Sequence, residues 1–174
     1  LDINNYMIEV ADAYAKGDKD AASVLLELKG SIASDYSNPA GLSGNRLNFV
    51  NSLKDGAVEA YSKYGVLPSL TMAQAILESG WGNSSIGNNI FGIKAGSSWT
   101  GKTRRVKTSE QNANGSYYSI YADFRDYDSI AESIEDHAKL LSNSHYSQYG
   151  VNTSNNYTEA CTRVKQAGYA TSLD

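Results

Sequence analysis

The sequence predicts a domain that is mostly α-helical and carries one small β-hairpin. Two observations lead to this prediction. Apolar residues recur every three or four positions through most of the chain, which is the period of an amphipathic helix. Between residues 104 and 121, two short segments of strand-forming residues instead flank the turn-forming run Asn-Ala-Asn-Gly at 112–115. We therefore expect an α+β fold in which helices are the majority.

Size and composition fit one folded domain with a small appendage. The chain has 174 residues and a mass of 18.8 kDa, 41% of its residues are hydrophobic, and its mean hydropathy is -0.44. A disordered chain would carry fewer apolar and more charged residues, and no run approaches the roughly 18 apolar residues that span a bilayer.

The net charge of -4 argues against nucleic acid as a partner, because phosphate binding normally leaves a basic surface. We expect a monomer that binds no nucleic acid and does not insert into a membrane.

Residues 1–43 form a predicted helical extension. Apolar spacing predicts helices over 2–15 and 20–29, and residues 31–44 are rich in Ser, Asn and Gly, which is typical of a loop. The main domain, 44–174, begins at the end of this loop. Two amphipathic helices must each bury one face, so we expect the extension to pack against the main domain. The chain begins with Leu and stops abruptly, so we expect it to be a piece of a longer protein.

Two helices and a long loop open the main domain. Apolar spacing predicts a helix over 47–64, and Gly65 ends the pattern. Pro68 suits the first turn of the next helix, which we expect to cover 68–79 and to stop at the glycines that follow. The glycine-rich stretch 87–101 predicts a loop.

The second half of the domain combines the hairpin with two more helices. We expect short strands over 104–108 and 116–121. A polar hairpin inside a helical domain suggests a flap at a functional site. The remaining helices are expected after an N-cap at Asp128 or Ser129, with apolar residues up to Leu141, and over 156–167, where Gly168 ends the last one.

Metal and nucleotide chemistry find little support in the sequence. The two histidines, His137 and His145, and the single cysteine, Cys161, lack the spacing of a zinc site. There is also no glycine-rich phosphate-binding loop and no Gly-x-Ser-x-Gly nucleophile elbow. We therefore expect neither a metal ion nor a cofactor.

Glu78 is the most informative titratable residue. It follows Ile76 and Leu77 near the end of an apolar helix and precedes the run Ser-Gly-Trp-Gly. A carboxyl beside apolar side chains has its charged form disfavoured, so its pKa rises and it can donate a proton to a leaving oxygen. The glycines let the backbone turn sharply beside a ligand. An ordinary surface glutamate near a helix end explains the same pattern equally well.

Several ordered blocks of sequence resemble a known family. They are LPSLTMAQAILESGWG at 67–82, NNIFGIK at 88–94, FRDYDS at 124–129, DH at 136–137 and AGYAT at 167–171. In order and spacing, from about residue 45 to 174, they resemble the glucosaminidase family of bacterial cell-wall hydrolases, glycoside hydrolase family seventy-three. That family includes autolysins and the flagellar peptidoglycan hydrolase domain.

The resemblance implies both a fold and an activity. The fold is a lysozyme-like helical domain over 44–174, with the hairpin as a small lobe that flanks a substrate groove. The activity is that of a secreted, wall-associated endo-β-N-acetylglucosaminidase, which cleaves the β-1,4 bond after N-acetylglucosamine in the glycan strands of peptidoglycan. Glu78 matches the family's catalytic acid, Glu110 the second carboxylate in the β-lobe, and Tyr169 a tyrosine that lines the groove close to the acid. Asp136 matches a position with a supporting role.

The role of Glu110 depends on its distance from Glu78. About 5 to 5.5 Å suits the nucleophile of a retaining enzyme, whereas about 6.5 to 9.5 Å suits the base of an inverting enzyme. A third route uses the substrate's own acetamido group as nucleophile, steered by a carboxylate or by Tyr169. A solvated charge at the end of a strand is the alternative to a catalytic role.

Candidate sugar-binding residues carry either an aromatic ring or an amide. Tyr occurs 13 times, and its flat apolar face with a hydroxyl suits sugar rings. Packing in the core explains several of these aromatic residues equally well. The expected contacts are Asn88, Asn89, Phe91, Trp99, Tyr118 and Tyr127, with Trp81 in a supporting position.

Three further observations bear on function. Arg104, Arg105 and Lys107 form a basic cluster that suits the acidic groups of the peptide stems, although a solvated surface is the better explanation for them. A muramidase or a lytic transglycosylase would cut the same polymer at a different bond or by a different reaction. A non-catalytic wall-binding module would use the same aromatic residues without cleaving any bond.

Overall fold

The computed structural model describes residues 44–155 and 157–169. The predicted extension, with its helices over 2–15 and 20–29, lies outside the described residues. The predicted α+β class with a helical majority is confirmed. The elements are α3 (Gly44–Tyr64), α4 (Pro68–Ser79), β1 (Thr103–Gln111), β2 (Tyr117–Arg125), α5 (Ile130–Leu141), α6 (Ser144–Ser147), the 3-10 helix η1 (Val151–Thr153) and α7 (Tyr157–Gln166).

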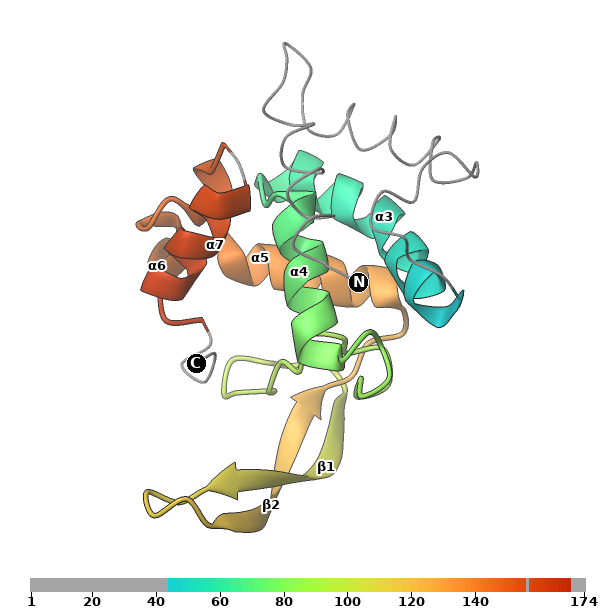
Figure 1. Ribbon diagram of the computed structural model, residues 1–174, viewed down its shortest axis with the longest axis vertical. Helices are drawn as coiled ribbons and strands as arrows, with labels where there is room; N and C mark the ends of the chain where they lie inside the picture. The colour runs from blue at the N-terminus through green and yellow to red at the C-terminus, as the bar shows by residue number, and fades with distance from the viewer. Residues whose placement is uncertain (1–43, 156, 170–174) are drawn as a thin grey trace.

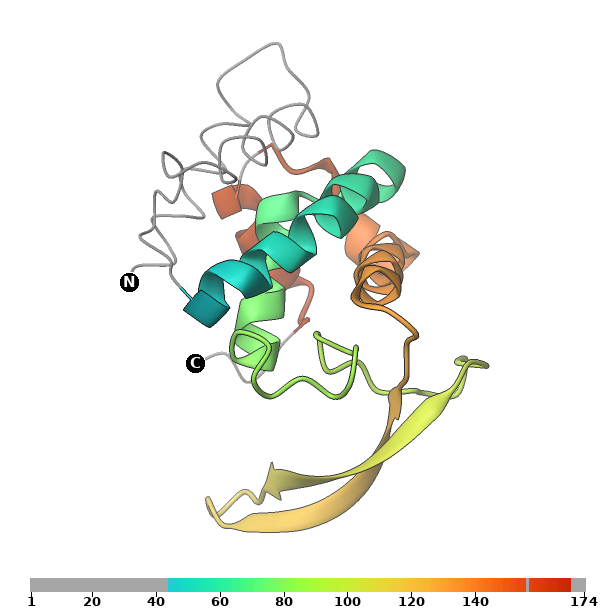
Figure 2. The ribbon, with the colours of Figure 1, turned by 90° about the vertical axis from the view of Figure 1, so that its right-hand side faces the viewer.

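The helices form one lobe, and the hairpin extends from it as a separate arm (Figure 1). Within the lobe α3 packs against α5 and α4, and α4 also contacts α7. The core between them contains the fully buried side chains of Leu53, Leu70 and Ile134. Gly56 lets α3 and α5 approach closely, because a Cβ at this position would lie 2.8 Å from Cδ1 of Ile134. Figure 2 shows the hairpin curving beneath the helical lobe.

The helix boundaries follow the local chemistry that the sequence indicates. Pro68 occupies the start of α4, where its missing N–H removes no helical hydrogen bond. Gly65 adopts a φ of +73°, and a Cβ there would lie 2.5 Å from the carbonyl oxygen of Asn152, so only glycine fits. Of the two predicted caps of α5, Ser129 is the one used, because its hydroxyl accepts a hydrogen bond from the backbone N–H of Glu132.

The hairpin is longer than the sequence predicts. Each strand has nine residues instead of the five or six expected, and they pair antiparallel from Thr103 opposite Arg125 to Gln111 opposite Tyr117. The additional residues of β1, 109–111, are polar, so their alternation gives no hydrophobic signal. Backbone pairing extends the strands where side-chain pattern does not. The predicted turn is confirmed, with a hydrogen bond from Gly115 N to the Asn112 carbonyl.

The loop after α4 fastens the base of the hairpin to the helical lobe. The backbone N–H of Ala95 donates to the carbonyl of Asp123 at 2.8 Å, and that of Arg125 donates to the carbonyl of Ile93 at 3.0 Å. The backbones of Lys94 and Phe124 form an isolated antiparallel β-bridge, and the side chain of Phe124 is buried. The hairpin is therefore anchored at one end. Among the described residues, none of the helices combines the length and apolar character that crossing a bilayer requires.

Candidate active site

Glu78 lies one residue before the end of α4. This end of the helix is the one that faces the hairpin (Figure 1). The Glu78 side chain is exposed, yet the surrounding protein partly desolvates the carboxyl and raises the pKa of Glu78 above its usual range. Within the described part of the chain, no hydrogen bond or ion pair ties down this carboxyl. The group is thus both accessible to a ligand and biased toward its protonated form.

The backbone turn after Glu78 is unusual. Gly80, Trp81 and Gly82 all have positive φ values, of 54°, 62° and 85°, and Trp81 is the one described non-glycine residue in this conformation. The hydroxyl of Ser79 donates to the carbonyl of Ala75 at 2.5 Å and accepts from the N–H of Gly82 at 2.8 Å. These bonds hold a tight turn directly beside the candidate acid.

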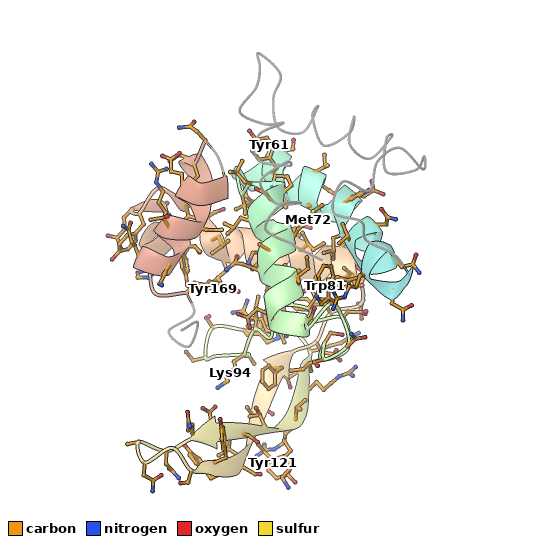
Figure 3. The ribbon with its side chains drawn as sticks, viewed as in Figure 1. Tyr61, Met72, Trp81, Lys94, Tyr121 and Tyr169 are labelled. Carbon is orange, nitrogen blue, oxygen red and sulfur yellow. The ribbon has the colours of Figure 1, made fainter. Side chains whose placement is uncertain are left out.

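Tyr169 lies beside Glu78 although the two are far apart in the sequence. Burial, followed by the negative charge of Glu78, raises the pKa of the Tyr169 phenol above its usual range. Tyr169 therefore stays a neutral hydrogen-bond donor over the whole range in which Glu78 titrates. Figure 3 labels Tyr169 and Trp81 on opposite sides of α4, with Lys94 between α4 and the hairpin.

Glu110 and Tyr118 pair across the hairpin and share one of its faces. Side chains alternate between the two faces of a strand, so this face also contains Phe124, which is buried against the helical lobe. Glu110 therefore lies on the face that the hairpin turns toward the helices. The ammonium of Lys94 lies 3.5 Å from its carboxylate, and the side chain of Tyr118 is exposed.

Asp136 supports the base of the hairpin. Its Oδ2 accepts hydrogen bonds from the guanidinium of Arg125 at 2.8 Å and from the hydroxyl of Tyr127 at 2.5 Å. The guanidinium of Arg125 also lies 4.7 Å from the ring centre of Trp99, which meets the ring of Tyr127 edge-on. Tyr127, only 6% exposed, thus belongs to this support instead of contacting a sugar. Arg125 covers one face of Trp99, and Gly101 also lies against this ring, since a Cβ at Gly101 would be 2.5 Å from Cζ2 of Trp99.

Asn88, Asn89 and Phe91 hold the loop in place. The amide of Asn89, a residue 1% exposed, donates to the carbonyls of Ile93 and Arg125, and its oxygen accepts from the N–H of Ile93. The amide of Asn88 donates to the carbonyl of Tyr127 at 3.1 Å. Phe91 is 3% exposed. We expected sugar contacts from these three side chains. The structure instead engages the Asn89 amide and the Phe91 ring within the protein, whereas Asn88 is half-buried and uses one N–H of its amide for the Tyr127 carbonyl.

His137 is a buried component behind the site. Its ring stacks on Phe91 with centroids 3.8 Å apart, meets Tyr169 edge-on, and hydrogen bonds through Nε2 to Gln74 at 2.8 Å. Burial lowers the pKa of His137 to about 3, so the ring is neutral near pH 7. His137 and Phe91 therefore form a rigid, uncharged backing for Tyr169. No group of three or more potential metal-ligating side chains exists among the described residues.

Comparison with known protein families shows the family to which the chain belongs. The family model of glucosaminidases, described as mannosyl-glycoprotein endo-beta-N-acetylglucosaminidase, matches residues 54–174. The chain belongs to the glucosaminidase family. The exo-glucosaminidase LytG of Bacillus subtilis is 41% identical to this chain over a 133-residue alignment that covers 72% of the chain and 46% of LytG. The peptidoglycan hydrolase FlgJ of Salmonella typhimurium is 36% identical over 78% of the chain and 44% of FlgJ. The chain thus spans about half the length of these relatives.

Solved structures show the same fold. The glycoside hydrolase domain of Salmonella typhimurium FlgJ superimposes with a TM-score of 0.61 at 32% identity, covering 74% of this chain and 79% of that one. The catalytic domain of the autolysin Auto from Listeria monocytogenes gives a TM-score of 0.62 at 35% identity, covering 76% and 80%. The lysozyme-like α+β fold that the sequence resemblance implies is therefore shown for this chain.

Two residues of the glucosaminidase site were not anticipated from the sequence. Arg125 forms an ion pair with Asp136 and a cation–π contact with Trp99. Lys94 forms an ion pair with Glu110. Both lie inside blocks that resemble the family, at 124–129 and 88–94. A basic residue next to buried aromatic residues is the signal that could have singled out Arg125, since such a charge needs a partner.

Proposed function

We propose that this domain is an endo-β-N-acetylglucosaminidase that hydrolyses the glycan strands of peptidoglycan, with Glu78 as general acid. The observation that carries the proposal is the state of the Glu78 carboxyl: accessible, without a partner among the described residues, and with a raised pKa. Membership of the glucosaminidase family supports the choice of bond. The names of LytG and FlgJ, a glucosaminidase and a peptidoglycan hydrolase, support the choice of polymer.

In the proposed reaction the strand lies between the end of α4 and the hairpin. Protonated Glu78 donates its proton to the glycosidic oxygen while the bond from that oxygen to the anomeric carbon breaks. The neutral phenol of Tyr169 donates a hydrogen bond to the sugar beside Glu78. A water molecule finally supplies the hydroxyl group at the new reducing end.

Glu110 is the proposed second carboxylate. Its position on the inner face of the hairpin, with Lys94 at 3.5 Å, supports a role opposite Glu78. It acts as a base toward water, as a nucleophile, or by steering the acetamido group of the substrate. The anomer released first separates the routes: an inverting base yields the opposite configuration, whereas a nucleophile or the acetamido route retains it.

Sugar contacts beside the two carboxylates are assigned to the side chains that remain accessible. Tyr118 is 46% exposed next to Glu110. The partly buried Trp99, which lines a hollow with Tyr127 and Asp136, is the second proposed sugar contact. Asp136 acts as a positioning residue through Arg125 and Tyr127. Trp81 acts through the turn that follows Glu78. We assign no sugar contact to Asn89, Phe91 or Tyr127.

The working location follows from the polymer. An enzyme for peptidoglycan acts outside the cytoplasm, so the protein is proposed to be secreted and associated with the wall, as a monomer. The sequence boundary at residue 44 remains the proposed start of the catalytic domain, with 1–43 as an extension that packs against it.

The deciding experiment is the Glu78→Gln variant on purified cell walls. We expect a loss of reducing-end formation of at least about a hundredfold, because the general acid is removed. Glu135→Gln, an exposed glutamate on α5, is the control and keeps its activity. A folded Glu78→Gln variant with full activity would overturn the assignment.

Product analysis tests the bond and the mode of attack. Reducing-end N-acetylglucosamine supports the proposal, reducing-end N-acetylmuramic acid indicates a muramidase, and anhydro ends indicate a transglycosylase. Long fragments early in the digest support internal cleavage, whereas disaccharides from the start indicate an exo-enzyme. Binding to walls without new ends would mark a wall-binding module.

A further inference from the structure

The hairpin has a second face that the proposed reaction does not use. Alternation along the paired strands places Arg105, Lys107, Tyr117 and Tyr121 together on this face, opposite the one that contains Glu110. We call these four residues the outer hairpin face. Figure 3 labels Tyr121 on the hairpin at a distance from the helical lobe.

The two tyrosines of this face contribute little packing to the protein. Tyr117 is 73% exposed and Tyr121 is 63% exposed, the two largest values among the exposed large hydrophobic residues described. Four residues along a strand separate them by about 13 Å. Two exposed aromatic rings on the same face of one strand offer stacking surfaces to successive groups of an extended polymer.

The face also carries positive charge in an acidic chain. Lys107 lies directly opposite Tyr121, and the guanidinium of Arg105 lies 5.8 Å from the centre of the Tyr121 ring. Arg105 has one weak ion pair, to Asp123 at 3.9 Å, and no carboxylate of the described residues pairs with Lys107. The neighbouring Arg104 points to the other face and pairs with Asp126 instead.

We propose that the outer hairpin face binds a second peptidoglycan strand, next to the strand that is cut. Resting on the proposed function, this inference assigns the sugar rings to Tyr117 and Tyr121 and the carboxylates of the peptide stems to Lys107 and Arg105. Charge complementarity identifies the occupant, because stem peptides carry carboxylates and the face is cationic while the chain as a whole is acidic. One hairpin then contacts two neighbouring strands of the wall, one on each face.

The test compares insoluble and soluble substrates. The variant Lys107→Gln/Tyr117→Thr/Tyr121→Thr keeps strand-forming residues at both tyrosine positions. Binding is measured by sedimentation on ice with purified walls from which phosphate polymers have been extracted. Hydrolysis is measured on a soluble, peptide-free glycan oligomer. We expect about tenfold weaker binding to walls and unchanged hydrolysis of the oligomer.

Controls separate this surface from general effects. Tyr149→Thr/Lys165→Gln removes an exposed tyrosine and an exposed lysine from the helical lobe and leaves wall binding unchanged. Lys107→Gln alone changes no packing, and its deficit shrinks as salt is added, whereas Lys107→Arg restores binding. Walls whose stem carboxylates have been amidated bind the parent and Lys107→Gln equally.

Several results would overturn the inference. The inference fails if the parent and the triple variant bind walls equally. It also fails if the triple variant binds more weakly only to walls that retain their phosphate polymers. If the triple variant also hydrolyses the soluble oligomer more slowly, and Lys107→Gln binds walls as well as the parent does, the effect belongs to the inner face of the hairpin and the inference fails. If the parent cleaves neither substrate, the proposed function fails instead.

Discussion

The guanidinium of Arg46, in the first turn of α3, lies 4.7 Å from the ring centre of Trp81, in the turn after α4. Trp81 has the left-handed backbone conformation that glycine normally occupies. The turn is also pressed against α3 at Phe49, which lies beside Gly82. The first helix of the main domain therefore holds the turn that fixes the orientation of Glu78.

The contact between α3 and this turn is tested by Gly82→Ala. The new Cβ would lie 2.7 Å from the ring of Phe49, so the variant combines a strained φ of 85° with overpacking that costs about 1–3 kcal/mol. We expect a lower free energy of unfolding in urea and slower wall hydrolysis. Gly96→Ala is the control, since Gly96 has a φ of 62° but no atom within 4 Å of a Cβ. Equal losses in the two variants would contradict a role for the Phe49 contact.

Glu78→Gln is expected to stabilise the protein near neutral pH while it slows hydrolysis at least about a hundredfold. The raised pKa means that the folded state disfavours the carboxylate relative to the unfolded state. The stability that Glu78 contributes is therefore present below its unfolded pKa and lost as pH rises through the folded pKa. Urea unfolding of both proteins at pH 7 and pH 4 measures the difference, which shrinks at the lower pH. Hydrolysis by the parent also falls as Glu78 deprotonates, because the general acid then has no proton to donate. A less stable glutamine variant at pH 7 would be inconsistent with a desolvated carboxylate.

Asp136→Asn is expected to weaken the attachment of the hairpin. The side chains of Asp136 and Arg125 are only 18% and 15% exposed, so removing the charge leaves Arg125 without its ionic partner and costs about 3 kcal/mol. Thermal or urea unfolding measures the loss, and slower hydrolysis reports the effect on the site. In the neighbouring control, Glu135→Gln, an exposed pair with Lys63 is broken at a cost below about 1 kcal/mol. Comparable losses in both variants would remove the special role of Asp136.

His137 predicts a component of acid instability. Its folded pKa of about 3 lies below the unfolded value near 6.5, so between these pH values the imidazole is protonated in the unfolded state and neutral in the folded state. The stability from His137 is complete above pH 6.5 and declines by about 1.4 kcal/mol per pH unit toward the folded pKa. His137→Phe keeps a ring against Phe91 but removes the titration. Unfolding of the parent and the variant is compared at pH 7 and pH 5, and an unchanged difference in stability would refute the assignment.

Much of the helical lobe could be predicted from the sequence because its signals are local. Periodic apolar residues defined α3 and α4. Pro68 and Gly80 marked helix ends by their backbone geometry, and Ser129 by its capping hydroxyl. Glu78 could be singled out for the same reason, since its apolar neighbours and following glycines are adjacent in the chain. The additional polar residues of β1, 109–111, gave no such signal.

The supporting residues of the site could be predicted less well, because their roles depend on contacts between distant segments. Asn89 and Tyr127 have side chains that suit a sugar, yet carbonyls of the loop and of β2 and the carboxylate of Asp136 occupy them. Arg125 gains its importance from Asp136, eleven residues later. An aromatic or amide side chain in the sequence does not reveal whether its partner is a ligand or the protein itself.

The hairpin's attachment at a single end has a consequence for how such domains diversify. The central hydrophobic cluster draws no side chain from residues 103–123 among those described, so the outer part of the hairpin can change with little thermodynamic penalty. Exchanging this segment between relatives with different cell walls should transfer substrate preference while leaving the melting temperature nearly constant. If recognition by the hairpin is confirmed, the part of the domain that selects the wall polymer is thermodynamically separate from the part that keeps the protein folded.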